Sequence, residues 1–296
     1  MRIVSLLPSA TEIVYALGLG DQLVGVTHDC DFPADARTKA RVSRTLLPPD
    51  ATPVEIDRLV TAASVPGGSP TEVLDEDVLA RLDPELIITQ DLCAVCAIPT
   101  DDVQAALTTL GCTAEVVSLD PSSIDEVLAG ISQVGAATRT DAEAAALVAG
   151  LRDRLDRVRA SVHGLPRRRV FALEWGDPPF NGGHWIPEMI ELAGGAPVLC
   201  EPGRDSVRVG WDQIAAAEAD VVVFTPCGYS LDEAAAEGKG LLDRPEIAGA
   251  EVWAVDADSL FVRPGPRLVD GIEVLAALLH PDAVGPVPPT SAHQLR

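Results

Sequence analysis

The sequence predicts an α/β protein of two Rossmann-like lobes, each with a parallel central sheet, joined by one long α-helix. Short apolar runs alternate with helical stretches in both halves of the chain, which is typical of parallel sheets covered by helices. The length of 296 residues also exceeds that of a usual single domain. We expect an N-terminal lobe over 1–140, a connecting helix over 141–165, a C-terminal lobe over 166–282 and a tail over 283–296.

The first half begins with a strand, a tight turn and a helix. Ile3 to Leu7 is a continuous apolar run closed by Pro8, which indicates a strand. A helix is predicted over 10–19, because Ser9 is a suitable N-cap and Glu12 follows it at the spacing of a capping box. The same patterns predict four more elements in this half, namely strands at 23–26, 85–89 and 116–119 and a helix at 124–138.

One long amphipathic helix is predicted between the two halves. Apolar side chains recur there at spacings of three and four, at Leu147, Leu151, Leu155, Val158 and Val162. A helix over about residues 141–163 spans on the order of 35 Å, about the width of one lobe. It is therefore long enough to join two lobes.

The second half repeats the first in kind. Strands are predicted at 170–173, 221–224 and 252–255, and helices at 186–193 and 268–279. The prolines after residue 281, at Pro286, Pro288 and Pro289, indicate an extended or disordered end.

Charge and hydropathy exclude several classes of partner. The chain has 45 acidic and 22 basic residues, a formal charge of -23, which repels nucleic acid and anionic lipid. No stretch approaches the roughly 20 apolar residues of a membrane-spanning helix. The N-terminal apolar run is too short for the core of a signal peptide. As written, the chain is expected to be a cytoplasmic monomer whose six cysteines are mostly reduced.

The predicted strand ends identify a candidate ligand site, because ligands of open parallel sheets bind outside the carboxyl ends of the strands. In the first lobe, the polar residues expected there are Ser9, His28, Asp29 and Asp91. In the second lobe, the expected ligand-binding residues are Trp175, His184, Trp185, Tyr229, Phe261 and Arg263. Aromatic residues make up only 4% of the chain, so their concentration at loop ends suggests a flat, largely apolar ligand stacked between rings.

Thiols and imidazoles near the same strand ends suggest metal chemistry. Cys93 and Cys96 form a CxxC, which with Cys30 and His28 could bind zinc or iron, or could simply line a loop as small apolar side chains. His28 could instead bond to a neighbouring carboxylate such as Asp29. We favour His184 as a metal or cobalt ligand, because the two preceding glycines let the backbone approach a bulky ligand.

Motifs of the common enzyme classes are absent from the sequence. It contains no GxSxG, HExxH, P-loop or GxGxxG pattern. Glu174 and Asp91 could in principle form an acid/base pair, although we favour loop polarity and hydrogen bonding as the role of both carboxylates. We therefore expect a binding protein and not an enzyme.

Several ordered motifs together resemble one family. They are Arg2-Ile-Val-Ser-Leu-Leu-Pro-Ser-Ala-Thr-Glu-Ile, Ala16-Leu-Gly-Leu-Gly, Leu82-Asp-Pro-Glu-Leu-Ile-Ile, Ile190-Glu-Leu-Ala-Gly-Gly and Arg263-Pro-Gly-Pro-Arg-Leu-Val-Asp-Gly. The chain up to about residue 281 is similar to the helical-backbone (class III) substrate-binding proteins of ABC importers, and most similar to their cobalamin-binding branch.

This resemblance implies a cobalamin, another corrinoid, a haem or a ferric chelate held in the cleft between two lobes. It also implies an ABC permease as partner, docked through an acidic surface residue on each lobe, for which the matching positions are Glu72 and Glu191. Relatives are periplasmic or lipid-anchored, whereas the first strand here begins at residue 2 or 3, so we expect a cytoplasmic relative. The alternatives are a cytoplasmic protein that binds zinc, iron, haem or a ferric chelate through Cys and His, and a corrinoid-processing enzyme that uses the thiols.

Overall fold

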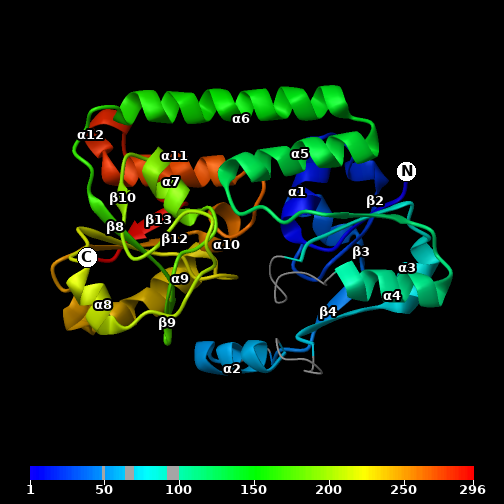
Figure 1. The fold of residues 1–296 in the computed structure, drawn as a ribbon, viewed down its shortest axis with the longest axis horizontal. Coiled ribbons are helices and arrows are strands. Elements are labelled where there is room, and N and C mark those ends of the chain that lie inside the picture. The colour runs from blue at the N-terminus through cyan, green and yellow to red at the C-terminus, as the bar shows by residue number, and fades with distance from the viewer. Residues whose placement is uncertain (49–50, 64–69, 92–99) are drawn as a thin grey trace. The chain divides into compact units, whose positions relative to one another are not determined.

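The computed structural model describes residues 1–296 except 49–50, 64–69 and 92–99. The chain divides into two compact units: unit 1 contains residues 1–121 and 128–148, and unit 2 contains residues 122–127 and 149–296. Helices α5 (Ile124–Thr138) and α6 (Asp141–Val162) therefore each contain residues of both units (Figure 1). The predicted α/β fold class with two lobes is confirmed.

Unit 1 is built on a five-stranded parallel sheet in the order β3-β2-β1-β6-β7. Its strands are β1 (Ile3–Ser5), β2 (Leu23–Val26), β3 (Ala40–Arg41), β6 (Leu86–Thr89) and β7 (Glu115–Ser118). A separate antiparallel pair consists of β4 (Ser43–Thr45) and β5 (Glu72–Leu74). The helices of unit 1 are α1 (Pro8–Ala16), α2 (Pro53–Ala63), α3 (Glu76–Leu82) and α4 (Thr100–Leu110), with 3₁₀ turns η1 (Gly20–Gln22) and η2 (Ala34–Thr38).

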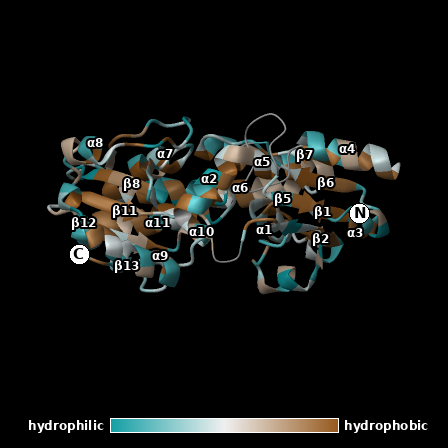
Figure 2. Ribbon diagram, turned by 90° about the horizontal axis from the view of Figure 1, so that it is seen from below, coloured by the Kyte–Doolittle hydropathy of each residue, from teal (hydrophilic) through white to brown (hydrophobic). Residues whose placement is uncertain are grey.

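The central strands of unit 1 are apolar on both faces, as a sheet covered by helices requires. Every residue of β1 and β6 is buried, and Figure 2 colours both strands as hydrophobic. Helix α1 begins two residues earlier than predicted. Its N-cap is Leu7, because Pro8 occupies the first helical turn, where its missing N–H costs nothing. The prediction of Ser9 as N-cap is therefore wrong.

Unit 2 is built on a sheet in the order β10-β8-β11-β12-β13, with β9 paired to β8. The pairs β10–β8, β8–β11 and β11–β12 are parallel, whereas β9 and β13 are antiparallel to their neighbours. The strands are β8 (Arg169–Gly176), β9 (Pro179–Asn181), β10 (Ala196–Pro197), β11 (Val221–Phe224), β12 (Glu251–Val255) and β13 (Ala292–Gln294).

The helices of unit 2 pack on this sheet around a core that includes Phe171, Val222 and Phe224. They are α7 (Ile186–Leu192), α8 (Trp211–Ala216), α9 (Leu231–Gly238), α10 (Ala257–Leu260), α11 (Leu268–Leu279) and α12 (Pro281–Val284), with 3₁₀ turns η3 (Lys239–Asp243) and η4 (Pro245–Ile247). None of the helices in the described ranges is both long and apolar enough to cross a membrane.

The C-terminal segment is folded onto unit 2. We expected an extended or disordered end, but α12 follows α11 directly and β13 completes the edge of the sheet. The pairing joins Val255 to Ala292 and Trp253 to Gln294, and the Ala292 side chain is buried. The prolines therefore shape a connection that returns to the sheet.

The two units share an arginine contact at the amino ends of their central strands. In unit 1, Arg2 precedes β1 and its Nε donates to the carbonyl of Asp83, which has a left-handed φ of 44°. In unit 2, Arg169 begins β8 and its Nε donates to the carbonyl of Glu218, whose φ is also 44°. Strand β6 pairs with β1 as β11 pairs with β8. Residues of the two units can therefore be matched position by position.

Candidate functional site

The loops that follow β8 and β11 in unit 2 bring two predicted ring contacts together. Trp175 lies near the end of β8, and its ring meets that of Tyr229 edge-on, with centroids 5.8 Å apart and an interplanar angle of 81°. Tyr229 lies in the turn after β11, where its N–H donates to the carbonyl of Pro226. Both residues are half-buried. Partly exposed aromatic rings of this kind can stack against a flat ligand.

Trp185 and Phe261, also predicted as ring contacts, lie in the interior of unit 2. Their exposed fractions are only 5% and 1%. The Trp185 indole Nε1–H donates to the carbonyl of Phe261 at 2.7 Å, which satisfies the polar group of the indole. The structure therefore uses both rings to pack the core of unit 2, and in the unliganded protein neither is presented to solvent as a stacking surface.

His184 is held in an unusual backbone conformation by a neighbouring loop. Its φ is +52°, and its N–H donates to the carbonyl of Arg204. The preceding residue, Gly183, donates its N–H to Ser206 Oγ at 3.0 Å. A Cβ atom at Gly183 would lie 2.2 Å from the backbone nitrogen of Ser206, so only glycine fits there. The glycine pair before His184 therefore positions this turn against the loop.

The His184 imidazole is suited to act as a ligand to a metal centre. The ring is half-buried, and its Nε2 lies 3.4 Å from Asp205 Oδ1. Burial lowers the pKa of His184, and the charge of Asp205 opposes this shift without reversing it. The ring is therefore neutral near pH 7, and a neutral imidazole has a nitrogen lone pair that can bind a metal.

Arg263 forms an internal ion pair and has little exposed surface. The side chain is 7% exposed and both its Nε and an NH2 group bond to the carboxylate of Asp258. The backbone N–H of Asp258 in turn donates to the carbonyl of Tyr229 at 3.1 Å. Arg263 thus stabilises the loop that carries the Tyr229 ring.

In unit 1, His28 is surrounded by acceptors at the end of β2. Its Nδ1 lies 3.2 Å from Glu72 Oε1 and 3.3 Å from Ser43 Oγ, and its Nε2 lies 3.3 Å from Asp29 Oδ1. The Ser43 hydroxyl donates to the same Glu72 oxygen. The hydrogen bond with Glu72 raises the pKa of His28, although burial opposes this. Both ring nitrogens of His28 are therefore in contact with protein acceptors, so the prediction of His28 as a metal ligand does not fit this geometry.

Cys30 and Ser9 are buried near the same strand ends. Cys30 is fully buried, and its Sγ lies 3.1 Å from Thr11 Oγ1 and 3.2 Å from Thr27 Oγ1. Ser9 is 2% exposed on helix α1. Neither side chain is presented to solvent, and the Cys30 thiol contacts two threonine hydroxyl groups.

Asp91 lies at the end of β6 in a small exposed carboxylate cluster. Its Oδ1 accepts a hydrogen bond from the N–H of Thr100 at 2.7 Å. Ser118 Oγ donates to Asp120 Oδ2 at 2.6 Å and lies 3.4 Å from Asp91 Oδ2. Asp91 belongs to unit 1 and Glu174 to unit 2, where the Ser206 hydroxyl donates to Glu174. Each carboxylate therefore has its own hydrogen-bond partner.

Comparison with known proteins identifies the family of this chain. Residues 3–254 match the periplasmic binding protein family. The chain belongs to the periplasmic binding protein family. A vitamin B12-binding protein of Vibrio cholerae is 25% identical over 285 residues, which cover 94% of this chain and 88% of that protein. An uncharacterised ABC transporter substrate-binding lipoprotein of Bacillus subtilis is 26% identical over 289 residues, 95% of this chain and 80% of the lipoprotein.

The fold of this periplasmic binding protein also matches solved structures. A periplasmic heme-binding protein from Pseudomonas aeruginosa superposes with a TM-score of 0.72 at 21% identity, over 99% of this chain and 97% of that one. The predicted resemblance to helical-backbone binding proteins is confirmed, and the chain is a substrate-binding protein of the ABC-transporter type. Members of this family are binding proteins and not enzymes.

The predicted metal ligands of this binding protein are only partly described. Cys93 and Cys96 lie outside the described residues. Within the described ranges, which omit 92–99, no three or more His, Cys, Asp or Glu side chains are grouped as a metal site. Within the described part of the chain, His28, Cys30 and His184 therefore do not belong to a group of three or more such side chains that could hold a metal.

The two carboxylates predicted to dock on a permease lie in different environments. Glu191, near the end of α7, is exposed, as docking requires. The Glu72 side chain is only 6% exposed and bonds to His28 and Ser43. A buried, paired carboxylate is not available for docking at the surface, so the predicted docking role of Glu72 does not fit the structure.

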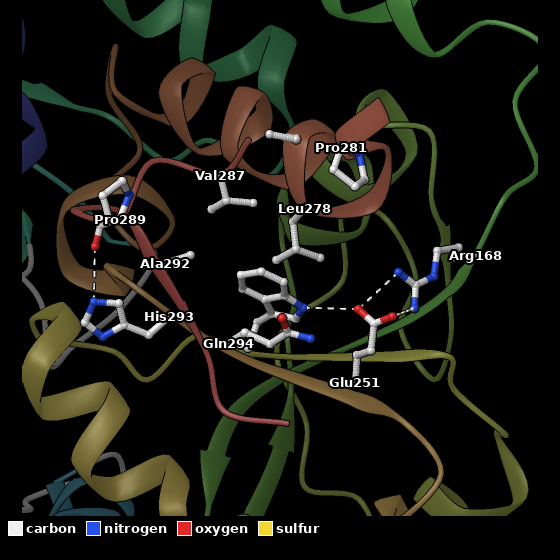
Figure 3. A pocket seen from close by; sticks show the side chains of 11 residues that line it. Arg168, Glu251, Leu278, Pro281, Val287, Pro289, Ala292, His293 and Gln294 are labelled. Carbon is white, nitrogen blue, oxygen red and sulfur yellow. Dashed lines mark hydrogen bonds and ion pairs between the residues drawn. The ribbon is translucent and has the colours of Figure 1, made fainter. Parts of the chain in front are cut away.

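A pocket of about 670 Å³ in unit 2 is separate from the predicted site. Figure 3 shows it between α11, the C-terminal segment and the start of β12, where Arg168 pairs with Glu251. It is lined by Arg168, Glu251, Trp253, Ala277, Leu278, Pro281, Val287, Pro289, Ala292, His293 and Gln294. None of the predicted ligand-binding residues lines it, and Arg168 and Glu251 lie at the amino ends of their strands.

Two further polar residues, Thr225 and Gln90, lie at the carboxyl ends of the central sheets. Thr225 follows β11 and Gln90 follows β6, and each is buried with a side-chain oxygen that has no hydrogen-bond partner in the described part of the chain. Their position immediately after a predicted strand was the available signal. Their burial and lack of a partner could be found only in three dimensions.

Proposed function

We infer that this protein binds cobalamin or a related corrinoid at its strand-end loops. The vitamin B12-binding relative of Vibrio cholerae aligns with nearly the whole chain, which supports this ligand class. Corrinoids are large, flat macrocycles with a metal at the centre. They therefore need broad apolar contact surfaces and, for direct ligation of cobalt, a neutral nitrogen donor.

One observation carries the proposal: a short series of contacts joins the aromatic pair to the candidate cobalt ligand. Trp175 contacts Tyr229, and the adjacent Glu174 accepts a hydrogen bond from Ser206. The Ser206 oxygen in turn accepts the N–H of Gly183, next to His184. A stacking surface and a neutral imidazole are thus fixed to one another within unit 2.

Each side chain has a distinct proposed role. The rings of Trp175 and Tyr229 contact the flat apolar parts of the ligand, and His184 donates its lone pair to cobalt. Arg263 and Asp258 hold the Tyr229 loop in place. The protein then delivers the ligand to an ABC permease, with exposed Glu191 as a docking carboxylate.

Haem is the second candidate, supported by the fold shared with the heme-binding protein of Pseudomonas aeruginosa. It too is a flat macrocycle with a metal that accepts imidazole. The two candidates differ at the edge of the ring, where corrinoids have carboxamides and haem has carboxylates. Titrations with both ligands therefore distinguish them.

The test is a titration of the full chain with hydroxocobalamin, haem and a ferric chelate, followed by absorption spectroscopy and calorimetry. We expect the tightest binding with hydroxocobalamin and a shift of its visible bands on binding. Trp175→Ala should weaken binding by about tenfold or more, the effect of losing one buried aromatic contact. If the wild-type protein binds haem or the chelate but no corrinoid, the corrinoid proposal is wrong.

A matched pair of histidine variants tests cobalt ligation. His184→Ala should abolish the band shift, whereas His293→Ala should leave it unchanged, because His293 lies on β13 and bonds to the carbonyl of Pro289. If His184→Ala binds hydroxocobalamin with the wild-type spectrum, His184 does not ligate cobalt, and the remaining contacts account for binding.

A further inference from the structure

The hydroxyl of Thr225 is a buried hydrogen-bonding group without a partner. Thr225 is the first residue after β11 and is 2% exposed. Its N–H donates to the carbonyl of Leu173 at 2.9 Å, so β8 holds its backbone firmly at the carboxyl end of the sheet. Its Oγ1 has no hydrogen-bond partner among the described residues. Such a group lowers the stability of the unliganded protein, and a native protein that retains one often uses it elsewhere.

The equivalent residue of unit 1 has the same property. Gln90 follows β6 as Thr225 follows β11, by the match that Arg2 and Arg169 establish between the units. Gln90 is 4% exposed, and its Oε1 also lacks a partner in the described part of unit 1. Packing alone gives no reason for two matched positions to share this cost. A ligand at the carboxyl ends of the strands gives one.

The surroundings of Thr225 connect it with the proposed site. Leu173, its hydrogen-bond partner through the backbone, is followed by Glu174 and Trp175. Tyr229, four residues after Thr225, contacts the Trp175 ring. The turn after Thr225 and the end of β8 therefore carry the aromatic pair. The hydroxyl has almost no exposed surface, so a ligand reaches it only when side chains around it move.

The chemistry of the two groups indicates what the ligand offers. A threonine hydroxyl donates one hydrogen bond and accepts others, whereas a glutamine Oε1 only accepts. A carboxamide can satisfy either type of group, because it has both a donor and an acceptor. A corrin ring carries carboxamides around its periphery, whereas haem carries carboxylates.

We propose that the Thr225 hydroxyl hydrogen-bonds to a peripheral carboxamide of the ligand and contributes to its selection. The inference rests on the proposed function and names the ligand group that Thr225 recognises. Thr225 then belongs to the binding surface, although it is buried in the unliganded protein. Its partner becomes available only when the ligand is bound.

The test compares Thr225→Val with Thr225→Ser in the full chain. Valine replaces the hydroxyl with a methyl group of similar size, whereas serine keeps the hydroxyl. Thr225→Val should weaken hydroxocobalamin binding by about fivefold to tenfold, the usual effect of one lost hydrogen bond. Thr225→Ser should bind within about twofold of wild type.

A stability measurement on the unliganded variants separates recognition from a structural role. Because the hydroxyl has no partner, Thr225→Val should leave the melting temperature unchanged or raise it. A clear fall in the melting temperature of Thr225→Val, or unchanged affinity for hydroxocobalamin, would overturn the inference. Failure of the wild-type protein to bind any corrinoid would instead overturn the proposed function, so the two failures are distinguishable.

Discussion

The pair formed by His28 and Glu72 gives the most quantitative prediction. At 3.2 Å, opposite unit charges attract by about 5 kcal/mol with an effective dielectric constant of about 20. The cost of burying Glu72 and half-burying His28 offsets much of this attraction. We therefore expect Glu72→Gln to lower the free energy of unfolding by about 1–3 kcal/mol, the range for a hydrogen bond to a charged group.

The sign of the pH dependence follows from the raised pKa of His28. In the unfolded chain the imidazole has an ordinary pKa of about 6.5. Folding therefore favours the protonated ring, and the stabilisation is complete below this pH and is lost as the pH rises through the higher pKa of the folded state. The cost of Glu72→Gln should accordingly be larger at about pH 6 than at about pH 9.

Urea unfolding of wild type and Glu72→Gln at both pH values measures this difference. Taking the difference between the two proteins removes the titration of the many other carboxylates, which both share. Asp29→Asn is the matched control, because the Asp29 side chain is 55% exposed and its pairing with His28 should contribute less than about 1 kcal/mol. An equal cost of Glu72→Gln at both pH values would refute the charge-pair argument.

Three further predictions concern unit 2 and helix α6. Burial lowers the pKa of His184, so protonation at low pH favours the unfolded chain. The free energy of unfolding of wild type relative to His184→Gln should therefore fall as the pH drops below about 6.5, opposite to the trend for His28. Urea unfolding at two pH values measures this difference. Gly183→Ala should destabilise the protein by about 1–3 kcal/mol, since no space exists for its Cβ, whereas Gly150→Ala, in open space on helix α6, should raise the melting temperature slightly. Arg154→Met should cost about 1–3 kcal/mol in urea unfolding, because Arg154 ties α6 to Asp270 and Glu273 of α11; a cost below about 0.3 kcal/mol would contradict this.

Elements with a strong local pattern could be predicted closely from the sequence. The spacing of apolar residues predicted a helix over about 141–163, and α6 is Asp141–Val162. The apolar run at 221–224 is strand β11. In both cases the signal is contained in neighbouring residues. The C-terminal strand was missed because its pairing with β12 is a long-range contact that no local pattern specifies.

The side chains at the strand ends were predictable from the sequence, but their surroundings were not. The sequence indicated Trp175 and Tyr229, whose rings are in contact, and also His184 in the same unit. The sequence could not indicate that Glu72 bonds to His28, because that contact depends on how strand β5 pairs with β4 beside Ser43. Long-range packing likewise decides which aromatic rings remain exposed.

Each central sheet has an arginine that stabilises the amino ends of its strands, away from the loops at the carboxyl ends. Arg2 and Arg169 fasten the amino ends to left-handed turns, and those contacts involve no residue of the strand-end loops. The opposite ends carry the side chains that differ between the units, such as Gln90 and Thr225. If the proposed function holds, sequence changes at the carboxyl ends alter ligand choice while the contacts at the amino ends stay intact, and these loops are the place to redesign specificity.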